Sequence, residues 1–136
     1  MDDCERLQKI QVVLDDLANR AEQGAVILVE GPRDKASLEA LGIWGRIMMT
    51  SQKQLFNLAE SLSRYKDIII LSDWDKRGEE VARNAELFLK SNGAHPDCGP
   101  RKKLRLLTRK EVMDVESLHG YMERLRRECA LKPQHY

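Results

Sequence analysis

The sequence predicts an α/β protein with a central, mostly parallel, four-stranded sheet flanked by helices. Short apolar runs alternate along the 136 residues with segments of helical periodicity. The runs Ala25–Val29 and Ile68–Leu71 contain no polar residue, which is typical of strands buried on both faces. Repeated strand–helix units favour a parallel sheet with right-handed crossovers, so successive strands should end at the same edge of the sheet.

Each expected element has its own pattern. Residues 3–22 carry apolar side chains at helical spacing, and Gly24 suits the end of that helix. Further helices are expected at 33–41, 52–63, 79–90 and from 114 onward, and shorter strands at 46–49 and 104–107. The helix at 52–63 should be capped by Thr50 and Ser51 and should bury Phe56. We divide the single structural domain into an N-terminal helix (1–24), a central α/β unit (25–107) and a C-terminal helix and tail (108–136), which frays near Pro133.

The amino-acid composition limits the kinds of protein that this chain can be. The chain is 42% hydrophobic and 33% charged with a net charge of +1, so any basic surface must be local. No apolar run is long enough to span a membrane, and the acidic N-terminus does not resemble a secretory signal, so a cytoplasmic location is expected. Cys4, Cys98 and Cys129 are far apart in the sequence and form no Cys-x-x-Cys pair, which predicts three reduced thiols.

Three carboxylates follow buried strands. Glu30 comes directly after the first strand, and Asp73 and Asp75 follow the central one. Parallel strands should bring them to the same edge of the sheet, where α/β proteins bind ligands. Carboxylates that lie close together repel each other unless a cation lies between them, and Mg²⁺ prefers oxygen ligands. The alternative is structural, with Asp73 capping a helix and Glu30 pairing with a lysine.

Basic residues flank these carboxylates. Four of them are suited to gripping phosphate, or to pairing with nearby acids: Arg33, Lys35, Lys76 and Arg77. On the expected last strand, Arg101, Lys103 and Arg105 would share one face. That face is a candidate strip for a nucleic-acid backbone, or an edge strand protected by charge.

The two motifs resemble those of the Toprim domain, which topoisomerases, bacterial primases and several nucleases share. The resemblance covers about 25–107 and rests on Glu30-Gly31 and Asp34 in the first motif and Asp73-x-Asp75-x-x-Gly78 in the second. It implies a Toprim, Rossmann-like fold. It also implies an acid/base or metal-ligand role for Glu30, and one or two Mg²⁺ ions on Asp73 and Asp75, with Mn²⁺ as a substitute.

The resemblance also has implications for the glycines and the tryptophan of the two motifs. Gly31 and Gly78 would shape the two loops. Trp74 departs from the small residue or proline usual between the aspartates, and is either a stacking surface for a base or, as we favour, a hydrophobic plug. The chain is similar as a whole to small stand-alone archaeal Toprim proteins.

The sequence therefore favours a Mg²⁺-dependent nuclease, or a related phosphotransferase, acting on RNA or DNA. The alternative is a non-catalytic module that binds nucleic acid or protein, a role similar to that of the family member RecR. Such a module would form a homo-oligomer or bind a protein partner. A topoisomerase is excluded by length, and no Gly-rich phosphate loop supports a nucleotide enzyme.

Overall fold

A three-stranded parallel sheet forms the centre of the protein. The computed structural model describes residues 1–131. The strands are β1 (Val26–Val29), β2 (Arg46–Met49) and β3 (Ile68–Ile70), in the order β2-β1-β3. β1 therefore lies in the middle of the sheet, with Val26 opposite both Arg46 and Ile68.

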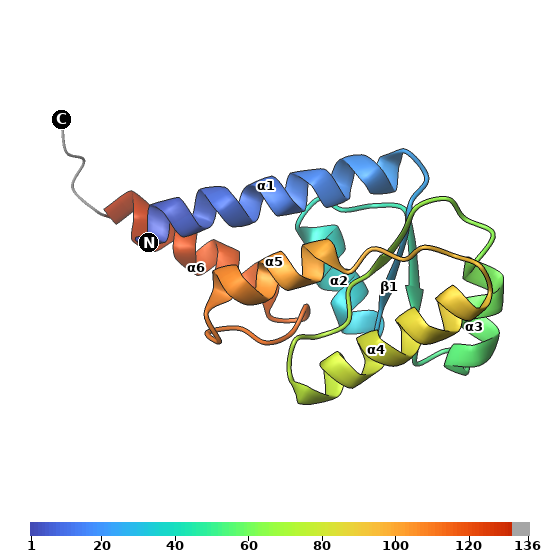
Figure 1. Cartoon of the computed structure of the whole chain (residues 1–136). Helices are drawn as coiled ribbons and strands as arrows, with labels where there is room; N and C mark the ends of the chain where they lie inside the picture. Colours follow the sequence, from blue (N-terminus) through green and yellow to red (C-terminus); the bar gives the residue numbers. More distant parts are fainter. Residues whose placement is uncertain (132–136) are drawn as a thin grey trace.

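Within residues 1–131, six helices surround the sheet (Figure 1). Their bounds, in chain order, are α1 (Asp3–Glu22), α2 (Pro32–Ala40), α3 (Leu55–Leu62), α4 (Lys76–Ser91), α5 (Gly99–Thr108) and α6 (Leu118–Leu131). In the described part of the chain, no helix is both long and apolar enough to cross a membrane.

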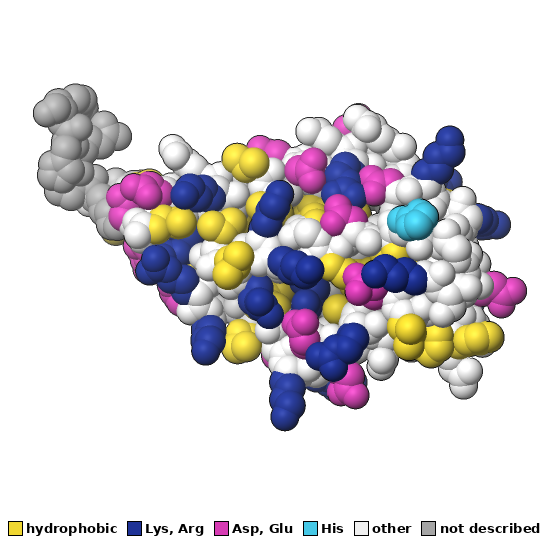
Figure 2. All heavy atoms as spheres, in the orientation of Figure 1, with side chains coloured by type: hydrophobic (Ala, Val, Ile, Leu, Met, Phe, Trp, Pro, Cys, Tyr) yellow, Lys and Arg dark blue, Asp and Glu magenta, His cyan; other side chains and the backbone are white. Residues whose placement is uncertain are grey.

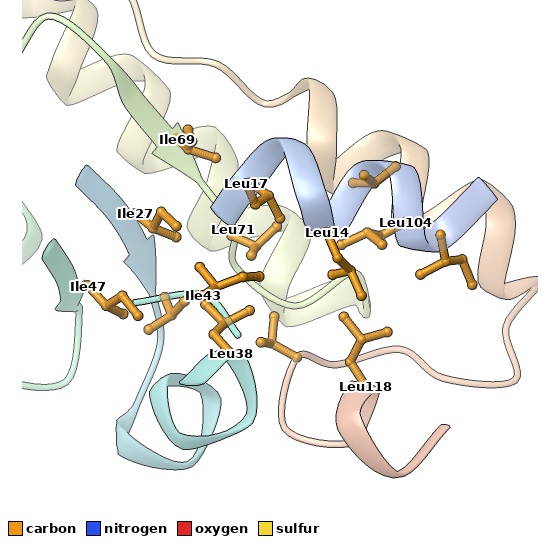
Figure 3. Packing of buried hydrophobic residues seen from close by; sticks show 14 of the residues in the cluster. Leu14, Leu17, Ile27, Leu38, Ile43, Ile47, Ile69, Leu71, Leu104 and Leu118 are labelled. Carbon is orange, nitrogen blue, oxygen red and sulfur yellow. The ribbon is translucent and has the colours of Figure 1, made fainter. Parts of the chain in front are cut away.

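Strand side chains alternate between two cores. Ile27 and Ile69 face a core built with α1, α2, α5 and α6, whereas Leu28 and Ile70 face a core built with α3 and α4. Figure 3 shows the first core, where Ile27 and Leu71 approach Leu17 of α1. Because both faces of the sheet are covered, β1 and β3 are continuous apolar runs, as the sequence predicted.

The predicted strand at 104–107 is wrong, since these residues belong to α5. Pro100 occupies the first turn of this helix, a position that proline favours, and Leu104 is buried against α1. Four residues that include three leucines do not distinguish a short strand from a buried helical turn. Beside β3, Asp97 alone exchanges backbone hydrogen bonds with Ile68 and Ile70, at 2.8 and 3.0 Å. The sheet therefore has three strands rather than four.

Smaller differences concern helix α3. It begins at Leu55, and its N-cap residue, Gln54, makes no side-chain capping bond, so the expected cap at Thr50 and Ser51 is wrong. Phe56 is 59% exposed rather than buried, and its ring packs edge-on against Phe88 of α4. The expected fraying at Pro133 lies outside the described residues.

The prediction of three reduced thiols is also wrong. Cys4 at the start of α1 and Cys129 near the end of α6 form a disulfide. The two helices pack side by side, so residues 125 positions apart meet (Figure 1). The sequence could not show this pairing, because it depends on the tertiary packing of the first and last helices.

Removal of the disulfide should lower stability more than any other cysteine change. Replacing Cys4 and Cys129 together by serine is expected to cost about 2–4 kcal/mol, because the bond closes nearly the whole chain into a loop. Thermal unfolding followed by circular dichroism measures this. Cys98→Ser is the control, since burial raises the pKa of its thiol to about 11 and keeps it protonated. Equal melting temperatures of the wild type with and without reductant would contradict the prediction.

Candidate metal and phosphate site

Glu30 and Asp73 meet at the carboxyl edge of the sheet. The peptide N–H of Asp73 donates a 2.8 Å hydrogen bond to Oε2 of Glu30. This contact joins the ends of β1 and β3, which are adjacent and parallel. The sequence predicted that these two side chains would lie close together, and they do.

A hollow of about 320 Å³ opens beside this pair. Its lining contains four carboxylates and two arginines. The lining residues are Glu30, Gly31, Pro32, Arg33, Asp34, Asp73, Arg77 and Glu116. The hollow thus combines an acidic floor, which suits a hard cation, with exposed guanidinium groups, which suit phosphate oxygens.

The carboxylates of this site affect one another. Burial, together with the negative charges of Glu30 and Asp34, raises the pKa of Asp73 to about 7. Burial also raises the pKa of Asp34, which is only 6% exposed. The Oδ1 atom of Asp73 accepts a 2.9 Å hydrogen bond from the N–H of Val115, which favours the charged form. Such a site takes up either a proton or a cation to relieve its repulsion.

Asp75 occupies a different position from Asp73. Its Oδ1 atom accepts a 2.7 Å hydrogen bond from the N–H of Gly78 and caps the N-terminus of α4. It is not part of the lining of the hollow. The capping role that the sequence left open for Asp73 therefore belongs to Asp75, and Glu30 bonds to a backbone amide rather than to a lysine.

The loop between β3 and α4 is held by buried contacts. Arg101 is 2% exposed, and its guanidinium donates to the carbonyl oxygens of Ser72 (3.1 Å) and Asp73 (2.8 and 3.2 Å). It also forms a 2.9 Å ion pair with Glu79 in α4. Arg101 therefore fixes the backbone that carries the aspartates, from a helix distant in sequence.

Trp74 is a plug, as favoured from the sequence. Its side chain is 4% exposed and belongs to the hydrophobic core. Its indole N–H donates a 2.6 Å hydrogen bond to the carbonyl oxygen of Val112, and its backbone N–H donates to Met113. The ring therefore anchors the segment before α6 to the acidic loop and offers no open face to a base.

The predicted basic residues separate into groups. Arg33 and Arg77 line the hollow, whereas Lys35 and Lys76 do not. The three residues expected to share a strand face are instead spread around α5: Arg101 is buried, Arg105 is exposed near Glu79, and Lys103 faces α1. The backbone-binding strip required a strand and is not present on α5.

Sequence reasoning did not place Asp34 and Glu116 among the site residues. The Oδ2 atom of Asp34 accepts a 3.0 Å hydrogen bond from the N–H of Gly31, which closes the turn at the start of α2. Its place three residues after Gly31, within the first motif, was the available signal. Glu116 reaches the hollow because the residues before α6 cross the sheet edge, and its carboxylate lies 3.5 Å from Arg33. No short-range sequence pattern predicts that the residues before α6 cross the edge of the sheet.

Replacing Arg101 by lysine should destabilise the acidic loop. One ammonium group cannot reproduce bonds to two carbonyl groups and a carboxylate, so a loss of about 2–3 kcal/mol is expected. The matched control is Arg105→Lys, because Arg105 approaches the same Glu79 at 3.6 Å but is exposed. Urea unfolding distinguishes the two. Equal stability of both variants would show that Arg101 does not hold the loop.

The structure thus has a parallel α/β sheet with a carboxylate after β1 and an acidic loop after β3, which is the arrangement expected of a Toprim domain. The Toprim domain model matches residues 25–105, and the chain belongs to this family. Membership supports a metal-dependent, nucleic-acid-related role in general, and Toprim domains generally bind Mg²⁺.

Relatives of known sequence extend the match beyond this domain. A UPF0292 protein of Methanosarcina barkeri is 41% identical over 122 residues, 89% of this chain and 85% of its own. One from Pyrococcus abyssi is 34% identical over 86% of each chain. Among solved structures, a putative protein from Aquifex aeolicus superposes with a TM-score of 0.65 at 27% identity, covering 77% of this chain and 94% of that one. The resemblance to small archaeal Toprim proteins is thus confirmed.

The side chains at the carboxyl edge of the sheet include oxygen donors for a metal ion. Among residues 1–131, no three acidic, histidine or cysteine side chains converge closely enough to hold a metal. The Glu30 and Asp73 side chains do line the same hollow, however, and Mg²⁺ usually keeps several waters and takes only one or two carboxylates. The site therefore fits a hydrated Mg²⁺ on Glu30 and Asp73.

Proposed function

We propose that this chain is a Mg²⁺-dependent nuclease that hydrolyses phosphodiester bonds in RNA or DNA. The observation that carries the proposal is the hollow at the carboxyl edge of the sheet. There Glu30 and Asp73 are joined by a hydrogen bond, and Arg33 and Arg77 line the same cavity. Mn²⁺ is expected to replace Mg²⁺, since both accept oxygen ligands.

The proposed roles follow from the contacts. Glu30 and Asp73 would hold the metal, which would polarise the phosphate and lower the pKa of a water molecule. Glu30 uses one oxygen to accept the Asp73 N–H, so its other oxygen remains to accept a proton from the attacking water. Arg33 and Arg77 stabilise the negative charge that develops on the phosphate oxygens as the bond to the leaving oxygen breaks. Asp75 holds the loop in place by capping α4.

A cleavage assay with Glu30→Gln tests the proposal. Structured and single-stranded RNA and DNA are incubated with Mg²⁺, Mn²⁺ or EDTA. The wild type should cleave at least one class of substrate with a metal present. Glu30→Gln should lose about 10²–10³-fold in rate, since glutamine is a poorer metal ligand and cannot accept the proton. Glu60→Gln, a change at an exposed glutamate on α3, should leave the rate unchanged. Equal cleavage by both variants would overturn the proposal.

A second candidate is a non-catalytic module that binds nucleic acid or protein. It is favoured by the cap at Asp75, which leaves only two of the three predicted carboxylates, Glu30 and Asp73, in the lining of the hollow. Binding of the same oligonucleotides in EDTA, without cleavage in Mg²⁺, would support this module rather than the nuclease.

A further inference from the structure

An apolar groove runs between α1 and α5, away from the carboxylates. Each helix contributes one lysine followed by two apolar residues three and four positions later. We call this surface the α1–α5 groove; its residues are Lys9, Val12, Val13, Lys103, Leu106 and Leu107. Its volume is about 350 Å³. Val12 is 68% exposed and Leu106 is 71% exposed, so the groove is open to solvent.

The groove continues past the end of α5. A second hollow, of about 440 Å³, shares Leu106 with it and is lined by Trp74, Arg105, Arg109, Lys110 and Met113. Met113 is 38% exposed. Figure 2 shows hydrophobic side chains between α1 and α5 with Lys and Arg around them. The two hollows together form one groove in which exposed apolar side chains lie beside cations.

The charged residues that line the two hollows are all of one sign. The two hollows are lined by five cations and no carboxylate: Lys9, Lys103, Arg105, Arg109 and Lys110. Arg105 lies 3.6 Å from Glu79. No ion pair joins the other four cations to an acidic group within residues 1–131. Lys9, Lys103, Arg109 and Lys110 therefore remain available to pair with acidic groups of a partner.

We propose that the α1–α5 groove binds an acidic amphipathic helix of a partner protein. An apolar stripe on such a helix would cover Val12 and Leu106, and glutamates or aspartates beside the stripe would face Lys9 and Lys103. A second copy of this chain, docked groove to groove, would bring like charges together. A nucleic acid would satisfy the cations but would leave the aliphatic side chains against a charged backbone, and Trp74 is too buried to stack on a base.

The location of the surface connects it to the acidic loop. Trp74 lines the second hollow and lies between Asp73 and Asp75 in the chain. A helix seated on the groove and its extension would therefore contact the acidic loop at Trp74. The proposal does not depend on nuclease activity, because it rests on a separate surface.

Fluorescence anisotropy tests the proposal with a synthetic probe. The probe is an 18-residue labelled peptide with leucines at i, i+3, i+4 and i+7 and glutamates beside them. The wild type should bind it with a Kd of about 10–100 µM, the range of weak transient complexes. Leu106→Asp and Lys103→Glu should each weaken binding at least tenfold. Leu87→Asp is the matched control, since Leu87 is 62% exposed on α4, and should bind as the wild type does.

Three results would overturn it. The first is equal or tighter binding of a peptide with lysines in place of the glutamates. The second is no binding of either peptide by a wild-type protein that is folded by circular dichroism. The third is a concentration-dependent dimer in sedimentation that Leu106→Asp abolishes and Leu87→Asp retains, which would assign the groove to a second copy. Loss of peptide binding in Lys103→Glu but not in Leu87→Asp supports it even if Leu106→Asp fails to fold.

Discussion

Asp73→Asn is expected to abolish metal-dependent cleavage and, at the same time, to stabilise the metal-free protein. Asparagine keeps an oxygen to accept the N–H of Val115 but removes the negative charge that burial, Glu30 and Asp34 disfavour. The wild type therefore loses stability as the Asp73 side chain ionises. We expect the variant to be more stable at pH 8 by about 1–2 kcal/mol, with partial exposure reducing the effect.

The pH dependence of this difference follows from the raised pKa of Asp73. Between the ordinary pKa of an aspartate and about 7, the folded protein binds a proton that the unfolded chain has released. The stability of the wild type relative to the variant should then fall as the pH rises from about 4 to 7 and stay low above it. Thermal unfolding in EDTA at several pH values measures it.

Added Mg²⁺ should make the wild type more stable than Asp73→Asn, the reverse of the order expected in EDTA. Binding to the folded state stabilises the wild type by mass action and leaves Asp73→Asn almost unchanged. Asp67→Asn is a useful control, because Asp67 is an aspartate whose pKa is lowered by Arg20, so its replacement should destabilise the protein. An Asp73→Asn protein that melts below the wild type in EDTA would contradict the account of repulsion in the site.

Gly78→Ala should cause the largest loss of stability from a single methyl group. A Cβ at Gly78 would lie 1.9 Å from the carbonyl oxygen and 2.3 Å from the carbonyl carbon of Asp73. Both are backbone atoms, and Arg101 holds the same carbonyl group, so the loop cannot move aside locally. Ser72 further ties the loop to the helix through a 2.7 Å hydrogen bond to the carbonyl oxygen of Gly78. We expect a loss of about 2–4 kcal/mol in the free energy of unfolding.

Gly120→Ala provides the matched control for this prediction. Gly120 lies in α6, and a Cβ there would meet no atom within 4 Å. Alanine is a better helix former than glycine, so this variant should gain about 0.5–1 kcal/mol. Urea unfolding of both variants measures the two effects. If Gly78→Ala were as stable as Gly120→Ala, the close packing of α4 against the acidic loop would be disproved.

The fold was largely predictable because its sheet is buried on both faces. Continuous apolar runs at β1 and β3 revealed the strands, and alternation with helices revealed their parallel order. The error at 104–107 came from a run too short to identify its own secondary structure. The disulfide between Cys4 and Cys129 was missed for a different reason: it depends on which helices become neighbours after folding.

The part of the candidate site that lies at the ends of the strands was predictable from the sequence. The part contributed by later segments of the chain was not. Glu30 and Asp73 follow directly from strand order, and they meet. The contributions of Arg101 and Glu116 come from α5 and from the segment before α6, whose paths across the sheet edge no local pattern determines. Whether an aspartate lines the hollow or caps α4 is likewise decided by loop geometry, as the difference between Asp73 and Asp75 shows.

The most direct test of the central claim is calorimetric titration of Mg²⁺ into the wild type, Glu30→Gln and the double variant Asp73→Asn/Asp75→Asn. The account predicts saturable binding by the wild type, weaker binding by Glu30→Gln and none by the double variant, with the same pattern for Mn²⁺. Equal binding by all three proteins, or no binding by the wild type even with an oligonucleotide present, would contradict a metal site at the carboxyl edge of the sheet.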